Sequence, residues 1–254
     1  KNGIKYALFP TNIRDDKVYA TISLDFGTAQ SLMNKGEILD LTAYLMLRSS
    51  ESQSLQQIAD KIIEVGGSAT ASPSSNGLNI QISAKKEKFA EFFQYVVDVL
   101  KNPAFEQSQF DLIKGQTLSS LDRPYTEPDT VSSLTMARTI EVYQPGDIRF
   151  HFEPELATRQ FKAATREQVV ALYQQFFKTH HAHIAVTGEF QPKSIQKMLK
   201  NSFADWKAVQ PYERLKSEYR SYPAQKIHAL SEQREFGSYQ ALLTFPVGAD
   251  HADV

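Results

Sequence analysis

The sequence predicts an α+β domain, with helices packed on one face of a mostly antiparallel sheet. Some segments alternate apolar and polar residues, as strands with one buried face do, and others place apolar residues three and four positions apart, as amphipathic helices do. Ser54 with Gln57 and Thr165 with Gln168 have the spacing of capping boxes, which mark helix starts. A chain of 254 residues with 41% hydrophobic residues can bury a substantial core.

The strands are expected in three regions of the chain. Residues 4–9 and 18–26 are joined by a polar turn at 12–17, which predicts an N-terminal hairpin. A third strand is expected over 78–84 after a turn at 73–76, and a fourth over 182–187, ending at Gly188.

Helical spacing predicts the remaining regular structure. Two helices are expected before the third strand and several between it and the fourth, with one more at the end of the domain. The ranges are 38–48, 54–65, 86–100, 107–121, 129–142, 155–161, 165–177 and 192–203.

A change of composition after the last helix predicts a domain boundary. Residues 1–208 form the α+β domain, and 209–225 are polar with Pro211 and Pro223, which suits a linker. Residues 226–254 are interpreted as the first strands of a second, similar domain, truncated here, with strands at 227–230 and 239–245. The start without methionine, on a strand-like run, also predicts a piece of a longer polypeptide.

Charge and composition exclude several classes of function. The formal net charge is −1 and the basic residues are scattered, so no surface for nucleic acid is expected. No apolar run reaches membrane-spanning length, so no membrane span is predicted. The absence of cysteine excludes disulfides, thiolate catalysis and cysteine-ligated zinc.

Several short motifs, in their order and spacing, resemble the insulinase/pitrilysin family of zinc metallopeptidases, which share the fold of the mitochondrial processing peptidase. The motifs are Asn2-Gly3-Ile4-Lys5-Tyr6-Ala7-Leu8, Ser54-Leu55-Gln56-Gln57-Ile58-Ala59, Gly66-Gly67-Ser68-Ala69-Thr70-Ala71, Asn102-Pro103-Ala104-Phe105, Ala185-Val186-Thr187-Gly188-Glu189-Phe190 and Phe203-Ala204-Asp205-Trp206. The resemblance implies two related halves that close around a peptide, one of them holding zinc through H-x-x-E-H on a helix and a further glutamate downstream.

The zinc-binding positions of this family are changed in the present sequence. Counted from Ser54, the two histidine positions hold Asp40 and Tyr44, and the glutamate position holds Ala43. The downstream carboxylate falls near Ser119, in a run without acids. The segment is therefore predicted to be inactive and to bind no metal or other cofactor, with zinc expected in the partner half.

The resemblance implies a non-catalytic, substrate-enclosing lobe of a zinc endopeptidase that degrades peptides or unfolded proteins. Its partners would be the catalytic half, in the same chain or in a partner subunit, and the peptide substrate. The alternative is an assembly subunit that uses the same fold only for docking in a larger complex. A location in the bacterial periplasm or cell envelope is expected from the family resemblance alone.

Other clusters of polar residues could carry chemistry of their own. His180, His181 and His183 precede or begin a strand, and the last two would share a face, as two metal ligands can. We favour a polar turn, because no acidic or cysteine residue lies nearby in the sequence. An independent metalloenzyme built on these histidines remains a third hypothesis.

Asp147 with Glu153 and Glu155 could likewise act as paired carboxylates, but acids in turns and at helix starts are common. His151, in the same region, is expected to pack or to lie in a surface turn.

Overall fold

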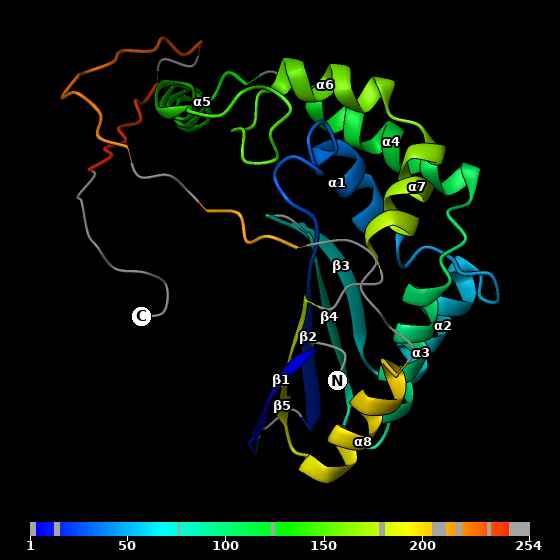
Figure 1. Cartoon of the computed structure of the whole chain (residues 1–254). Helices are drawn as coiled ribbons and strands as arrows, with labels where there is room; N and C mark the ends of the chain where they lie inside the picture. Colours follow the sequence, from blue (N-terminus) through cyan, green and yellow to red (C-terminus); the bar gives the residue numbers. More distant parts are fainter. Residues whose placement is uncertain are drawn as a thin grey trace.

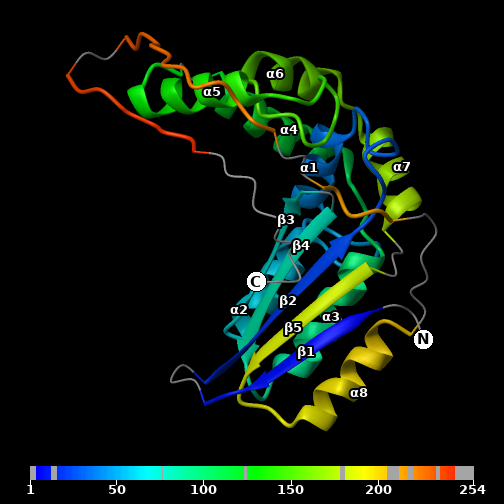
Figure 2. The same ribbon diagram turned by 60° about the vertical axis from the view of Figure 1, so that its left-hand side comes forward.

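A computed structural model describes residues 4–12, 16–75, 77–122, 125–177, 181–204, 212–216, 220–232 and 235–243. Their strands form one five-stranded sheet with the order β1-β5-β2-β4-β3 (Figures 1 and 2). The strands are β1 (Lys5–Pro10), β2 (Lys17–Asp25), β3 (Ser68–Ser74), β4 (Gly77–Lys85) and β5 (His181–Gly188). The α+β class with a mostly antiparallel sheet is thereby confirmed.

The first two strands do not form the expected hairpin, although both exist. β5 lies between them, pairing in parallel with β1 and antiparallel with β2. Thr21, for example, is level with Ala185 on one side and Gln81 on the other. β5 is an interior strand with a neighbour on each side, and its alternating apolar residues form one buried face.

Helices cover one face of the sheet, as expected. The strand residues that point toward them are buried and apolar: Val18, Ala20, Ile22, Leu24, Leu78, Ile80, Ile82, Ala84, Ala182, Ile184 and Val186. In Figure 2, α2 (Leu55–Glu64), α3 (Phe89–Lys101) and α8 (Pro192–Ser202) lie behind the sheet. Among the described residues, no helix covers the other face, which carries mainly polar side chains.

The remaining helices gather beyond one end of the sheet (Figure 1). They are α1 (Gly36–Leu45), α4 (Gln107–Leu121), α5 (Pro128–Ile140), α6 (Pro154–Ala163) and α7 (Arg166–Phe176). α1 is packed on nearly all sides, with six of its residues buried, whereas α5 extends outward and buries only Pro128. Among the described residues, no helix is long and apolar enough to cross a membrane.

Both predicted capping boxes form at the predicted positions. The Ser54 hydroxyl accepts a hydrogen bond from the Gln57 backbone N–H, and the Gln57 side chain accepts one from the Ser54 backbone N–H. Thr165 and Gln168 make the same pair of bonds at the start of α7. Each box satisfies backbone donors that the first helical turn leaves without a partner.

The two strands expected after α8 are absent from the part of the chain that the structure describes. Residues 212–216, 220–232 and 235–243 contain no strand, so the strand expected at 227–230 does not form, nor does the described part of the one at 239–245. Leu230 and Tyr239 are largely exposed there, and no sheet or helix covers them as a β-strand face requires. The division at residues 208 and 226 stays a prediction.

Candidate functional site

The positions that correspond to the zinc motif lie together on α1. Asp40 and Tyr44 are one turn apart and share a side of the helix, while Ala43 is buried in the core. Burial, together with the neighbouring charge of Glu37, raises the pKa of Asp40 to about 6. Burial, with a smaller contribution from Asp40, also raises the pKa of Tyr44.

A groove of about 500 Å³ runs along α1 on the Ala43 and Tyr44 side. We call it the edge groove; it is lined by Ala43, Tyr44, Leu47, Arg48, Leu55, Ala69, Thr70, Ala71, Ile113, Gln116 and Thr117. One wall is β3, the last strand of the sheet, which pairs only with β4. The side of β3 away from β4 therefore presents backbone donors and acceptors that no strand of this sheet uses.

The residues in and around the edge groove do not fit a zinc ion. Ala43 has no donor atom, and α4 faces the groove with Gln116 and Thr117, neither of which carries a carboxylate. Ser119, the expected position of the third ligand, is exposed on α4 and does not line the groove. Within the described ranges, no group of three or more His, Cys, Asp or Glu could hold a metal ion.

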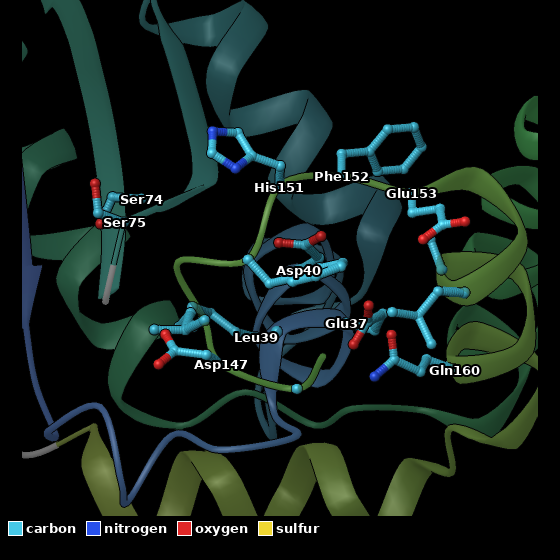
Figure 3. A pocket seen from close by; sticks show the side chains of 16 residues that line it. Glu37, Leu39, Asp40, Ser74, Ser75, Asp147, His151, Phe152, Glu153 and Gln160 are labelled. Carbon is cyan, nitrogen blue, oxygen red and sulfur yellow. The ribbon is translucent and has the colours of Figure 1, made fainter. Parts of the chain in front are cut away.

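A second cavity, of about 240 Å³, lies at the opposite, N-terminal end of α1 (Figure 3). We call it the acidic pocket. Its lining comes from four places: the first turns of α1, the end of β3, the loop between α5 and α6, and α6 itself. These residues are Gly36, Glu37, Leu39, Asp40, Ser74, Ser75, Gly146, Asp147, Ile148, Phe150, His151, Phe152, Glu153, Leu156, Ala157 and Gln160.

Hydrogen bonds within the loop between α5 and α6 fix its shape. The Glu141 carboxylate accepts from the backbone N–H groups of Val142, Tyr143 and His151, and lies 2.9 Å from His151 Nδ1. Asp147 accepts from the Arg149 guanidinium at 2.8 and 2.9 Å. The wall of the acidic pocket is therefore ordered by ion pairs that belong to the loop.

Ion pairs with arginine neutralise two of the four acids that line the acidic pocket. Asp147 is paired with Arg149, and Glu153 lies 3.6 Å from Arg138. Glu37 and Asp40 have no ion pair with any described residue. In Figure 3 the Asp40 carboxylate occupies the middle of the pocket, with Glu37 on one side. Burial also raises the pKa of Glu37. A hydrogen bond from its own backbone N–H opposes this shift but is the smaller effect.

The structure brings together residues that sequence reasoning had considered separately. Asp147, Glu153 and His151 line the pocket that holds Asp40, whereas Glu155 does not. Glu37 was not singled out from the sequence. The signal that could have found it is its spacing of three residues from Asp40, which places two acids on one side of the first turns of a helix.

His181 and His183 lie on β5, on the face of the sheet that the helices leave uncovered. The His181 ring packs against Tyr212 with a centroid separation of 4.3 Å, and the strand register places His181 level with Asp25. Burial raises the pKa of Asp25, and the nearby charges of His183, His181 and Arg214 oppose this. His180 lies outside the described residues.

Comparisons with known proteins identify the fold. Residues 163–246 match the family model described as the Peptidase M16 inactive domain. No match was found among curated proteins.

Solved structures with the same fold include a protease from Helicobacter pylori, with a TM-score of 0.68, 16% identity, and coverage of 86% of this chain and 52% of that one. The M16 inactive domain from Pseudomonas fluorescens has a TM-score of 0.67 at 13% identity, with coverage of 85% and 51%. The periplasmic protease PqqL from Escherichia coli has a TM-score of 0.69 at 15% identity, with coverage of 89% and 25%.

The present chain thus spans about half of the first two structures and a quarter of the third. At such low identities the structural likeness shows the fold, and the family model supplies the link in sequence. Together they confirm the resemblance drawn from the motifs: the chain has the fold of M16-type proteins, and residues 163–246 match the inactive domain of that family.

Proposed function

We propose that this inactive half serves as the substrate-enclosing lobe of a zinc endopeptidase that degrades peptides or unfolded proteins. The observation that carries the proposal is the free edge of β3, which runs beside α1 and forms a wall of the edge groove. An extended peptide can pair with such an edge through its backbone, whatever its sequence, while side chains enter the adjoining groove.

The uncovered face of the sheet supports the same role. It carries Thr21 and Ser23 from β2 and Asn79 and Gln81 from β4, side chains that water solvates well. The Ser23 hydroxyl donates a hydrogen bond to the Asn79 side chain on the neighbouring strand, so polar groups continue across this face. A polar face suits the wall of a hydrated chamber better than it suits a dry interface between domains.

The catalytic part of the reaction falls to the partner half. The motif positions of this half hold Asp40, Ala43 and Tyr44. They therefore provide neither the two imidazoles that would bind zinc nor the glutamate that would take a proton from water. Zinc and the general base would come from a half with an intact H-x-x-E-H, in the same polypeptide or in a partner subunit. The lobe would hold and orient the peptide against that centre.

The first experiment measures zinc content and peptide cleavage, with this chain alone and with the catalytic half present. We expect the chain alone to be inert and to carry less than stoichiometric zinc, and the combination to bind zinc and cleave. Stoichiometric zinc or cleavage by the chain alone would overturn the proposal. A stable but inactive combination would instead favour an assembly subunit.

Amide hydrogen exchange tests the use of the strand edge directly. A non-cleavable substrate peptide should slow exchange in β3, because pairing occupies its outward backbone N–H groups. β1 is the matched control, since it is the opposite edge of the same sheet. Equal protection of both edges, or protection of neither, would contradict peptide pairing at β3.

A further inference from the structure

The acidic pocket contains two carboxylates whose charge nothing nearby balances. Asp147 and Glu153 have arginine partners, but Glu37 and Asp40 have none among the described residues. Both belong to the first turns of α1 and both line the cavity. The cavity therefore keeps a net negative charge that a cationic group could compensate.

Part of the remaining lining of the acidic pocket is apolar and aromatic, beside the polar Ser74, Ser75 and Gln160. Leu39, Ile148 and Leu156 provide aliphatic surface, while Phe150 and Phe152 provide ring surface. This combination fits a cation carried on a hydrocarbon stem, because the stem is buried against the aliphatic side chains and the charge meets carboxylates or ring faces.

A metal ion fits this pocket less well. Calcium takes six to eight oxygen ligands, and the two unpaired carboxylates supply only part of such a shell. The remaining acids of the lining already accept hydrogen bonds from arginine or lie beside it. A volume of about 240 Å³ also exceeds what a single ion requires and leaves room for a side chain.

The acidic pocket lies at the end of the free strand edge. Ser74 is the last residue of β3, and Ser74 and Ser75 form one side of the cavity (Figure 3). A peptide paired with β3 would leave the strand at Ser74 and pass the mouth of the pocket. One of its side chains could then enter toward Asp40.

We propose that the acidic pocket binds the basic side chain, arginine or lysine, of a peptide held along the edge of β3. The two carboxylates of α1 receive its N–H groups, and the aliphatic and aromatic walls enclose its stem. Arginine fits best, because its planar guanidinium can donate to both carboxylates at once. This inference rests on the proposed function, since the peptide must lie on β3.

Two kinds of probe separate the pocket from the strand edge. The small probes are N-butylguanidinium and its neutral isostere N-butylurea, which report on the pocket alone. The long probes are two non-cleavable peptides that differ only by arginine or citrulline at one position. Binding is measured by calorimetry on the whole protein that contains this chain, as wild type and as the variants Asp40→Asn, Glu37→Gln and Asp98→Asn.

We expect the cationic member of each pair to bind at least about tenfold more tightly than its neutral isostere, since a hydrogen bond to a charged group is worth about that factor. Asp40→Asn and Glu37→Gln should each remove most of the preference. Asp98→Asn is the control: it removes the same charge from an exposed position on α3 and should change nothing. Circular dichroism verifies that every variant is folded.

The possible outcomes distinguish the two ideas. If both peptides bind equally and protect β3, the basic-residue pocket is wrong while the substrate-enclosing lobe stands. If N-butylguanidinium binds in an Asp40-dependent way but the arginine peptide does not bind, the pocket is right and the peptide-holding role of β3 is wrong. If neither cation binds more tightly than its isostere, the inference is overturned.

Discussion

The buried carboxylate of Asp40 destabilises the folded state when it is ionised. Replacing it with a neutral side chain should therefore increase the free energy of unfolding. Burial and the neighbouring Glu37 raise the pKa of the folded-state carboxyl from 3.8 to about 6. At about 1.4 kcal/mol per pKa unit, complete ionisation costs the folded state about 3 kcal/mol, and partial solvent exposure reduces the expected value to about 2 kcal/mol.

The pH range of this cost follows from the direction of the shift. The folded pKa lies above the unfolded one, so folding favours the protonated acid. The contribution of protonated Asp40 to the stability of the fold is fully present below about pH 3.8, and it is lost as the pH rises through about 6. Asp40→Asn, which stays neutral, should therefore stabilise the protein by about 2 kcal/mol near pH 8 and hardly at all near pH 4.

Urea unfolding of the wild type and of Asp40→Asn at both pH values measures the difference. Asp98→Asn serves again as the control, because it removes an equal charge from an exposed position. The reasoning is refuted if Asp40→Asn gives the same gain at both pH values, or destabilises the protein at the higher one.

Three further tests, the first of which compares two glycines, probe other parts of the structure. Gly77→Ala would place a methyl group 1.8 Å from the Leu24 carbonyl oxygen, so we expect a loss of at least about 2 kcal/mol, whereas Gly115→Ala on α4 meets no atom within 4 Å and should stabilise by up to about 1 kcal/mol. Ser54→Ala removes a capping box and should cost about 1 kcal/mol in urea unfolding, with Ser54→Thr retaining most of it. Glu141→Gln leaves one acceptor oxygen at a position where four donors converge. We expect it to lower the free energy of unfolding by about 1–3 kcal/mol, which is measured as a lower thermal midpoint. An unchanged midpoint would mean that the loop does not depend on this carboxylate.

The regular elements that bury apolar side chains could be predicted from the sequence. α2 and α7 begin at their capping boxes, and β2, β4 and β5 follow their alternating patterns. These signals are local, because a few neighbouring residues determine both the backbone and the buried face.

The features that could not be predicted are those that depend on contacts between distant parts of the chain. The pairing of β1 could not be read locally, since β5 lies far along the sequence. β3 consists of small residues, Ser68–Ser74, which form a strand because β4 supplies its hydrogen bonds rather than because of their own β-propensity. For the same reason no expected range covered it.

The candidate site was predictable in part. Asp40 could be named from the motif spacing, but its neighbours in the acidic pocket come from the end of β3, from a loop more than a hundred residues later, and from α6. Only the folded chain brings Asp147 and His151 to the end of α1. The unbalanced charge of Glu37 and Asp40 becomes visible once the partners of the other acids are known.

The insertion of β5 between β1 and β2 has a consequence for folding during synthesis. β1 leaves the ribosome first but has no neighbour in the sheet until residues 181–188 emerge. β2, β3 and β4 can pair much earlier, and they then present the β2 edge without a partner. We therefore expect the nascent domain to expose the backbone edge of β2 until β5 arrives, an interval in which pairing with another chain would compete with folding.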